Sequence, residues 1–579
     1  MTNKQLKNLK AKLWESADQL RANSGLKSTE YATPILGLIF LRFAESKYST
    51  FETGINAEYE KKKGTRAERP IHEIAVEKCG YYLPQEARFD YLLNLPESEN
   101  LAEKTKNAME KIEKYTAELI DTLPKDIYYS VNSEDDPLVL AKLFKVFKDI
   151  PTDISLDIFG EIYEYFLGEF ALAEGQGGGE FFTPSTVVQY MVEVLAPTEG
   201  EIFDPACGSG GMFVQTAHYI ARHSAKGSGI NLRAHGVEKT GATVKLAKMN
   251  LVLNNVRGSI TEANSYYRDP YESFGRFNYV MANPPFNVDE VELDQVKSQP
   301  RFNTYGVPQN KTKKNKKDAK ETVPNANYLW INLFATSLKE NGRAALVMAN
   351  SASDAGHSEK DIRIKLVESG IISQMVTLPT NMFTSVTLPA TLWFFDRAKP
   401  RKDEILFIDA RNIFTQIDRA HRKFSNEQVK NLAVISRLYE GKNDEFTALL
   451  NEYRAALAAA PETSGDEDVT PKAYWQEQID WLTTRFPDGV YVDVIGLCKA
   501  AKLDGEDGIK DQDYSLNPGR YVGVVIEDDG MSEEEFKTEM LKLNNELTAL
   551  NAEAQTLERT IADNLRSLVG SGTEVRSVE

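Results

Sequence analysis

The stretch EIFDPACGSGGMFVQTA (residues 201–217) joins a short apolar strand pattern to a glycine-rich turn and then to a helical pattern. Glycine lets the backbone approach a ligand closely, and the amides at the start of the next helix favour an anionic group. This order of elements is typical of a nucleotide-binding α/β unit. The candidate ligand-binding residues of the turn are Asp204, Gly208, Ser209, Gly210 and Gly211.

The next strand pattern, AHGVEK (234–239), contains the acidic residue Glu238 near its end. An acidic side chain at this place accepts hydrogen bonds from both hydroxyls of a ribose. Its distance from the glycines exceeds the usual ~20 residues, and an inserted loop at 221–231 accounts for the excess. The alternative, an α/β core with an ordinary glycine turn, is less favoured once Glu238 is included.

Strand and helix patterns alternate from residue 180 to about residue 410, which predicts a largely parallel three-layer α/β sheet. The strand candidates are EIFDPAC (201–207), AHGVEK (234–239), FNYVMANPPF (277–286), GRAALVMAN (342–350), ISQMVTLPT (372–380), ATLWFFDRA (390–398) and EILFIDAR (404–411).

The flanking regions show mainly helical patterns. Within residues 1–152, Leu6, Leu9, Leu13 and Leu20 share one helical face, and further helices are expected at 32–48 and 138–150. Residues 153–174 suggest a helix and 175–179 a flexible glycine run. In the region 411–530, helices are expected at 445–460 and 473–486, around an acidic tract at 461–471 that is expected to be disordered.

The last segment, residues 531–569, predicts a coiled coil. Apolar residues recur in alternating steps of four and three at Phe536, Met540, Leu543, Leu547, Leu550, Ala554, Leu557 and Ile561. Such a heptad seam is typical of helices that pair with a partner. The alternative is a long amphipathic helix on the protein's own core, and the narrow terminal seam favours the partner.

The length and the charge of the chain limit the number of domains and the kinds of partner that are expected. A chain of 579 residues is too long for one ordinary core, so about three domains are expected. The net charge of −18 argues against binding nucleic acid over the whole surface, although a local basic patch is compatible with it.

The segment 309–321 holds six lysines, and we expect 309–323 to be a mobile basic loop. A solvated charge run and a contact with a DNA backbone are equally compatible with it.

Three cysteines with no metal-ligand spacing favour a reducing cytoplasm, and no metal site is predicted. The apolar run at 35–41 is too short to cross a bilayer, so no membrane association is expected.

The stretch MANPPFNV (281–288) ends a strand pattern in two prolines. If the substrate is the exocyclic amine of an aromatic base, the Asn283 side-chain carbonyl and the Pro284 backbone carbonyl provide two acceptors for its hydrogens. Proline fixes φ and removes a competing donor, so the second carbonyl is held in one direction. Phe286 supplies a ring for stacking on the base. A plain Asn-Pro turn is the alternative, and the position at the end of a strand in a nucleotide-binding fold favours the site.

Upstream, GGGEFFTPSTVVQYMVEVL (177–195) predicts a helix with Thr183 as its N-cap and Pro184 at its first position. The glycine run before Phe181 and Phe182 suggests a loop that folds over a ligand.

Together these motifs resemble the S-adenosylmethionine-dependent N6-adenine DNA methyltransferases, and more narrowly the modification subunit of a Type I restriction–modification system. The resemblance covers most of residues 1–530. Beyond the motifs above, it rests on IFGEIYEYFLGEFA (158–171), RFNTYGVP (301–308), NANYLWI (325–331), the pair VTLPTNMF (376–383) and VTLPATLWFF (386–395), and SLNPGRYVGV (515–524).

The resemblance implies a Rossmann-like methyltransferase sheet at 153–410, an N-terminal helical domain at 1–152, a helical region at 411–530 and an assembly coiled coil at 531–569. It implies cofactor contacts from the segment at 180–185, the glycine turn, Glu238 and Asn264, and catalysis by the tetrapeptide at 283–286 on a flipped-out adenine. The residues of the first segment are Glu180, Phe181, Phe182, Thr183, Pro184 and Ser185, and those of the tetrapeptide are Asn283, Pro284, Pro285 and Phe286.

The resemblance also implies three partners: double-stranded DNA, a specificity subunit that reads the target site, and a restriction subunit. It further implies two modification subunits for each specificity subunit.

Two other functions stay open. NPPF is shared with stand-alone methyltransferases of RNA and of protein amides, and a non-catalytic scaffold that binds the cofactor is the third interpretation. Residues 309–323 and 425–515 depart from the family pattern, and the sequence does not identify the DNA target.

Overall fold

The computed structural model describes residues 3–26, 28–151, 162–163, 165–170, 183–223, 231–309, 321–383, 389–419, 421–461, 470–525 and 532–569. The chain forms two compact units, Met1–Gly523 and Val524–Glu579. The segments predicted at 153–161, 171–182, 310–320 and 462–469 lie outside the described residues.

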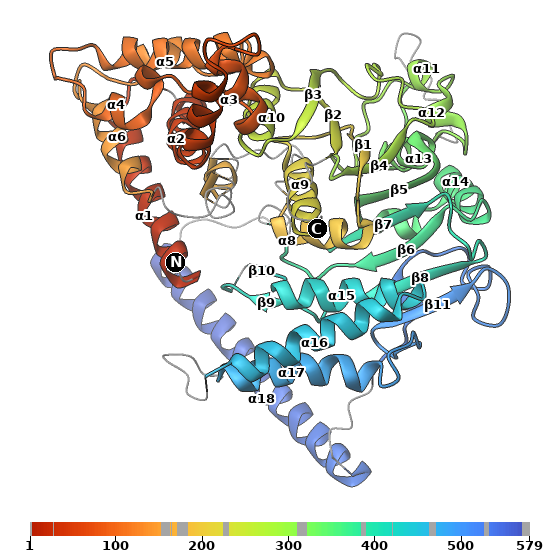
Figure 1. Ribbon diagram of the computed structural model, residues 1–579. Coiled ribbons are helices and arrows are strands. Elements are labelled where there is room, and N and C mark those ends of the chain that lie inside the picture. The colour runs from red at the N-terminus through yellow and green to blue at the C-terminus, as the bar shows by residue number, and fades with distance from the viewer. Residues whose placement is uncertain are drawn as a thin grey trace. The chain divides into compact units, whose positions relative to one another are not determined.

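One nine-stranded sheet forms the centre of the described part of the first unit, in the order β11-β8-β6-β7-β5-β4-β1-β2-β3 (Figure 1). Its strands are β1 (Gly200–Asp204), β2 (Leu232–Glu238), β3 (Arg257–Glu262), β4 (Phe277–Ala282), β5 (Leu338–Ala349), β6 (Ile372–Thr377), β7 (Ala390–Asp396), β8 (Glu404–Asp409) and β11 (Cys498–Lys502). Most pairings are parallel, which confirms the predicted α/β class, but β7 is antiparallel to β5 and β6, and β11 is antiparallel to β8.

All seven strand candidates overlap a strand of this sheet, because strands buried on both faces of an α/β sheet are rich in apolar residues. Two strands were not predicted. β3 has the sequence RGSITE, of which only Ile260 is buried, and β11 is the short segment CKAAK. Both lie at edges of the sheet, where little apolar surface is covered. A small separate hairpin is formed by β9 (Thr415–Gln416) and β10 (Arg422–Lys423).

Helices cover both faces of the sheet, as predicted (Figure 1). Along β1, Ile202 belongs to one core and Phe203 to the other. The first face carries α8 (Ser185–Leu195), α9 (Gly211–His223), α10 (Gly241–Leu253), α15 (Asn426–Tyr439), α16 (Asn443–Ala459) and α17 (Pro471–Arg485). The second carries α11 (Leu293–Val296), α12 (Pro300–Asn303), α13 (Asn327–Ser337) and α14 (His357–Glu368), with 3-10 turns at Asn350–Asp354 and Pro518–Arg520.

The N-terminal region is helical, as predicted. It contains α1 (Asn3–Arg21), α2 (Ser28–Lys62), α3 (Ile71–Cys79), α4 (Phe89–Leu93), α5 (Leu101–Tyr115) and α6 (Val139–Lys148), with 3-10 turns at Gln85–Ala87, Ala117–Leu119 and Asp126–Ser130. The core of this region includes Met249 and Val252 of α10. Lys47 of α2 donates a hydrogen bond to the backbone oxygen of Leu253 at 2.6 Å, so the N-terminal helices are bonded to the end of a helix that flanks the sheet.

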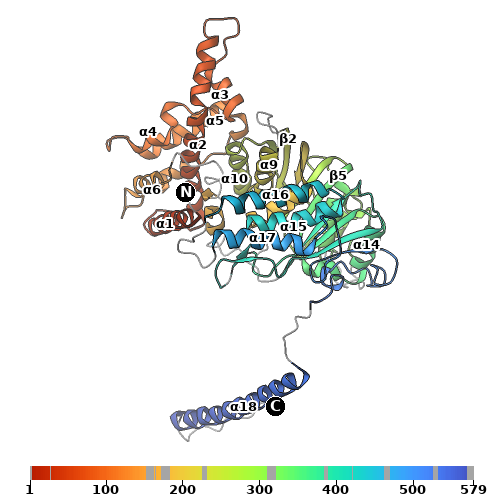
Figure 2. The same cartoon turned by 60° about the horizontal axis from the view of Figure 1, so that its bottom comes forward.

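The second unit contains α18 (Glu533–Val569), a single long helix (Figure 2). Seven apolar seam residues are between 50% and 57% exposed: Phe536, Met540, Leu543, Leu547, Leu550, Leu557 and Ile561. No helix among the described residues has the length and apolar character that a membrane span requires.

Candidate functional site

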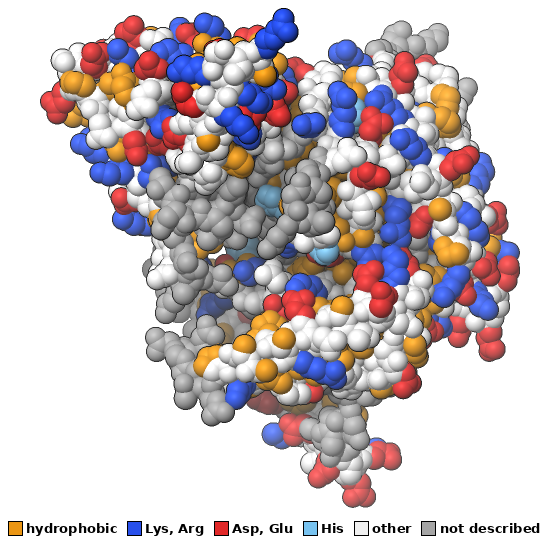
Figure 3. Space-filling view, in the orientation of Figure 1, with side chains coloured by type: hydrophobic (Ala, Val, Ile, Leu, Met, Phe, Trp, Pro, Cys, Tyr) orange, Lys and Arg blue, Asp and Glu red, His pale blue; other side chains and the backbone are white. Residues whose placement is uncertain are grey.

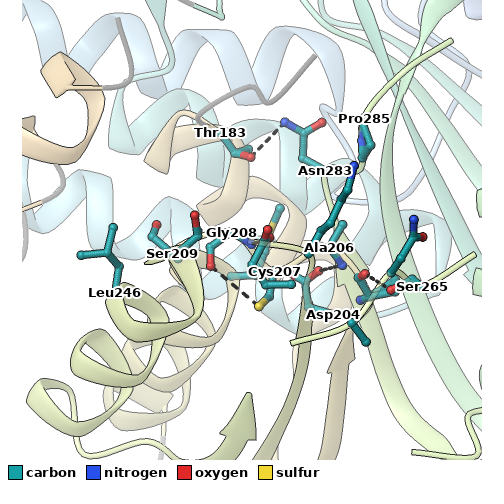
Figure 4. Close-up of a pocket in the computed structure, with 18 of the residues that line it drawn as sticks. Thr183, Asp204, Ala206, Cys207, Gly208, Ser209, Leu246, Ser265, Asn283 and Pro285 are labelled. Atoms are coloured by element: carbon teal, nitrogen blue, oxygen red, sulfur yellow. Dashed lines mark hydrogen bonds between the residues drawn. The ribbon is translucent and has the colours of Figure 1, made fainter. Parts of the chain in front are cut away.

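A cavity of about 610 Å³ lies where the parallel strands β2, β1 and β4 end (Figure 4). This volume falls in the range of about 300–1,000 Å³ that small-molecule sites occupy. Many of the predicted site residues line it: Thr183, Ser185, Asp204, Gly208, Ser209, Gly211, Glu238, Asn264, Asn283 and Pro285. Segments separated by about a hundred residues of sequence therefore meet at one edge of the sheet.

Four predicted site residues are not in the cavity wall: Pro184, Gly210, Pro284 and Phe286. Gly210 has a φ of +81°, and an added Cβ would lie 3.0 Å from Leu251, so this glycine serves the close packing of the turn on α10. Phe286 packs against the cores on both faces of the sheet. Glu180, Phe181 and Phe182 lie outside the described residues.

The glycine turn presents backbone to the cavity. Gly208 has a φ of +50°, and an added Cβ at Gly208 or Gly211 would meet no atom within 4 Å, so the space there is open. α9 begins at Gly211, which brings the amides of a helix start to the cavity wall. Asn250 of α10, which sequence reasoning missed, donates its Nδ2 hydrogen to the backbone oxygen of Ser209 at 2.9 Å and fixes the turn.

The Glu238 carboxylate is oriented by two backbone amides at the end of β2. Its Oε2 accepts from Gly208 N at 3.1 Å, and its Oε1 accepts from Thr240 N at 2.9 Å. A carboxylate held in this way is an acceptor of fixed direction at the cavity wall.

Asp204, at the end of β1, is almost completely buried, and its Oδ1 accepts from Ala206 N at 2.9 Å. Burial raises the pKa of Asp204 well above its usual range, and the negative charge of Glu238 raises it further. Strongly perturbed carboxyl groups in cavities are typical of functional sites.

An aromatic pair that sequence reasoning missed lines another part of the cavity. The ring centroids of Tyr266 and Trp330 lie 4.8 Å apart. Asn264 is close by in sequence, and its side-chain oxygen accepts from Tyr266 N at 3.0 Å. Trp330 belongs to α13, more than sixty positions further along the chain, so no local pattern links it to Tyr266.

Asn283 follows the last residue of β4, and its Nδ2 donates to Thr183 Oγ1 at 3.0 Å. Figure 4 shows this bond, with the amide oxygen of Asn283 on the side of Pro285. The prediction that Thr183 caps α8 is wrong: the helix begins at Ser185, Pro184 occupies the N-cap position, and no side chain caps it. Since the helix starts one residue later than predicted, Thr183 lies outside the cap position and orients Asn283.

The N-terminal helical region also contributes to the wall, through Ala32 and Leu36 of α2. Leu167 and Phe170, which follow that region in the chain and belong to its core, line the wall as well. Apolar residues in helices resemble ordinary core residues, so the sequence carries no indication of this role. On the face shown in Figure 3, basic and acidic side chains are interspersed over the described residues.

Comparison with known proteins gives two family matches. The description "N-6 DNA Methylase" matches residues 154–529, and "HsdM N-terminal domain" matches residues 9–150. The chain is 32% identical over 570 residues to the Type I restriction enzyme MjaIX methylase subunit of Methanocaldococcus jannaschii, covering 96% of this chain and 90% of that one. It is 32% identical over 509 residues to the Type I restriction enzyme HindI methylase subunit of Haemophilus influenzae, covering 86% and 97%.

A solved structure has the same fold. The type I restriction-modification system methyltransferase subunit from Streptococcus thermophilus matches with a TM-score of 0.63 and 19% sequence identity, over 89% of this chain and 99% of that chain.

Proposed function

The chain belongs to the N-6 DNA methylase family, and we propose that its cavity is the site where a methyl group passes from S-adenosylmethionine to an adenine in DNA. It is an adenine-specific DNA methyltransferase and belongs with the methylase subunits of Type I restriction–modification systems. Beyond this, we propose which of its residues bind the cofactor and which bind the amine that is methylated.

The cavity fits S-adenosylmethionine on the chemistry of its wall. Amides at the start of α9 suit the carboxylate of the methionine end, and the oriented Glu238 carboxylate suits two ribose hydroxyls. The open space at Gly208 and Gly211 allows close approach to the backbone. Asn264 and the Tyr266–Trp330 pair suit an adenine ring, through a polar edge and aromatic faces.

The corner after β4 suits the amine that is methylated. The nitrogen lone pair of an exocyclic amine is delocalised into the base, so the amine is a weak nucleophile. Two carbonyl acceptors would bind its hydrogens and draw the nitrogen towards a tetrahedral geometry. They are Asn283 Oδ1 and the backbone oxygen of Pro284, a residue that is not itself in the wall but lies between the wall residues Asn283 and Pro285. The Asn283–Thr183 bond engages Nδ2 and so sets which way Oδ1 faces. When bound, S-adenosylmethionine supplies an electrophilic methyl group on a sulfonium, so no protein nucleophile is required.

The observation that supports this most strongly is the meeting of Thr183, Asp204, Glu238 and Asn283 around one cavity. The test reconstitutes the full-length chain with a DNA-reading specificity subunit, incubates the complex with unmethylated DNA and methyl-labelled S-adenosylmethionine, and digests the DNA to nucleosides. The expected label is on N6-methyladenine. Label on cytosine, or label only on RNA or protein when these are offered instead of DNA, would contradict the proposal.

We propose that α18 binds a specificity subunit through its exposed seam, and that double-stranded DNA and a restriction subunit complete the assembly. Two methylase subunits for each specificity subunit is the expected stoichiometry. Supporting this, an apolar seam that is half exposed along one helix is typical of a coiled-coil partner surface.

The seam is tested by co-purification of the full-length chain with that subunit. Leu547→Glu places a charge in the seam and should abolish co-purification, whereas Ala552→Glu, on the opposite side of the same helix, should not. Equal co-purification of the two variants with the specificity subunit would contradict the proposal that the seam binds it.

A further inference from the structure

The segment NANY (325–328) has no role in the chemistry described above, although it lies beside the catalytic corner. Asn287 is the residue directly after Phe286, and it has a φ of +57°. Asparagine is among the few residues that adopt this left-handed conformation readily. The chain therefore leaves the corner through a sharp turn, and the side chains of Asn325 and Asn327 contact that turn.

Four hydrogen bonds join the three asparagines. Asn327 binds Asn287 in two places: its Oδ1 accepts from Asn287 N at 2.8 Å, and its Nδ2 donates to Asn287 Oδ1 at 3.0 Å. Asn325 Nδ2 donates to the same Oδ1 at 3.0 Å, and Asn325 Oδ1 accepts from Asn327 N at 2.8 Å. Both amide groups of the NANY segment thus converge on one residue of the turn.

The part of this cluster that belongs to α13 is held by the buried core. Asn327 is only 3% exposed and is the first residue of α13, all of whose residues are buried. The backbone adds a fifth bond, from Ala326 N to Val288 O at 2.8 Å. Asn287 itself is exposed. A buried helix therefore fixes a turn that lies at the surface.

The catalytic tetrapeptide is consequently restrained at both ends. Before it, Asn283 is bonded to Thr183, and after it, Asn287 is bonded to Asn327. None of Asn287, Asn325 and Asn327 lines the cavity. Their influence on methyl transfer is therefore indirect, through the segment that carries the Asn283 and Pro284 carbonyls.

We propose that Asn287, Asn325 and Asn327 are positioning residues that hold the tetrapeptide in the geometry required for methyl transfer. This inference rests on the proposed function of Asn283 and Pro284. Carbonyl groups must point at the amine hydrogens within a narrow angle, so a small rotation of the corner weakens both contacts. Misplacement of a reacting group by ~1 Å costs as much as 10²-fold in rate.

Because Asn287 is exposed, two substitutions there can separate the loss of its side-chain acceptor from a change in the backbone. Asn287→Gly keeps the left-handed backbone without strain and keeps the N–H donor, but it removes the Oδ1 acceptor. Asn287→Asp keeps an acceptor for both side-chain amides and also tolerates the left-handed conformation. The matched control is Asn255→Gly, the same change at another exposed left-handed asparagine, where α10 ends.

Each full-length variant is reconstituted with the DNA-reading subunit and compared with wild type. The measurements are single-turnover methylation of DNA at saturating S-adenosylmethionine, the cofactor Kd and the thermal midpoint. Asn287→Gly should slow methyl transfer about tenfold, with the Kd and the midpoint close to wild type. Asn287→Asp should recover most of the rate, and Asn255→Gly should match wild type.

Three results would overturn the inference: an unchanged rate in Asn287→Gly, equal slowing in Asn287→Gly and Asn287→Asp, or loss of cofactor binding and thermal stability together with the rate. The last would mean that the cluster serves folding. If the wild-type complex places no label on adenine, the proposed function has failed instead, so the two failures are distinguishable.

Discussion

Two loops leave neighbouring strands of the sheet, at the same edge, and they are built from opposite kinds of residue. β1 and β4 pair in parallel, with Ile202 opposite Tyr279. After β1 the chain forms a glycine turn, in which Gly208 and Gly210 have positive φ and the amides of a helix start reach the cavity. After β4 it forms a corner with two successive prolines, which have no backbone N–H to offer.

Because of this difference, hydrogen-bond donors lie on one side of the cavity and hydrogen-bond acceptors on the other. The glycine turn supplies N–H groups, which suit the anionic end of a cofactor. The proline corner supplies carbonyl oxygens, which suit the hydrogens of an amine. Changes in the corner should therefore affect the chemical step, and changes in the glycine turn should affect cofactor binding.

The largest effect is expected from Asn283→Ala. This change removes the proposed side-chain acceptor for the amine and should lower the rate of methyl transfer by about 10²–10³-fold, the usual cost of losing one preorganised hydrogen-bonding group in a transition state. The cofactor Kd should stay within about threefold of wild type, a difference of less than 1 kcal/mol. Single-turnover methylation and equilibrium binding of S-adenosylmethionine measure the two quantities.

Two variants separate the causes of that loss. Thr183→Val removes only the bond that orients Asn283, and the slowing should be less than about tenfold, the value of one ordinary hydrogen bond. Asn283→Asp keeps an acceptor but adds a charge that must be desolvated, so an intermediate rate is expected. Full activity in Asn283→Ala would refute the role of the corner.

A smaller effect, on binding rather than rate, is expected from Gly208→Val. The left-handed backbone there is unfavourable for valine by roughly 1–2 kcal/mol, and the side chain would project into open space of the cavity. The cofactor Kd should rise about tenfold or more, while the rate at saturating cofactor stays near wild type.

Gly64→Val is the matched control for that change. Gly64 also has a positive φ and open space around a Cβ, but it lies between α2 and α3 and does not line the cavity. It should carry the same backbone strain without weakening cofactor binding. A similar Kd change in both variants would show that strain alone is responsible.

The sequence predicts this pair of loops well because each follows a short apolar strand pattern. Glycine and proline have strong local preferences, so EIFDPACGSGG and MANPPF indicate both where a strand ends and what the loop offers. Parallel strands then bring these ends to one edge without any further information. The direction of β7 was not predicted, because an apolar run carries no sign of its orientation.

The rest of the wall could not be predicted from local patterns. All residues of α13, which contains Trp330, are buried, and Leu36 lies in the buried run 34–48 of α2, so both look like core residues. Asn287 and Asn327 are forty positions apart, and only the folded chain brings their amide groups together. The position of Thr183 before Pro184 predicts a helix cap, yet the Thr183 hydroxyl is bonded to Asn283, a hundred positions away.

The smallest effect concerns the buried carboxyl group at the end of β1. Because burial raises the pKa of Asp204 in the folded chain, the folded state retains a proton over a pH range in which the unfolded chain has lost it. Stability is therefore lost as pH rises above about 3.9, the ordinary value of aspartate.

Asp204→Asn should remove this loss, since asparagine does not titrate and its carbonyl still accepts from Ala206 N. The thermal midpoint at pH 8 should rise by about 2 °C, with a smaller difference from wild type at pH 5. Asp409, at the end of β8, provides the contrast, because its carboxylate binds the Arg411 guanidinium through Nε at 2.9 Å and through Nη2. Asp409→Asn should lower the midpoint. If both variants shift the midpoint in the same direction, burial of Asp204 is not what costs stability at this edge of the sheet.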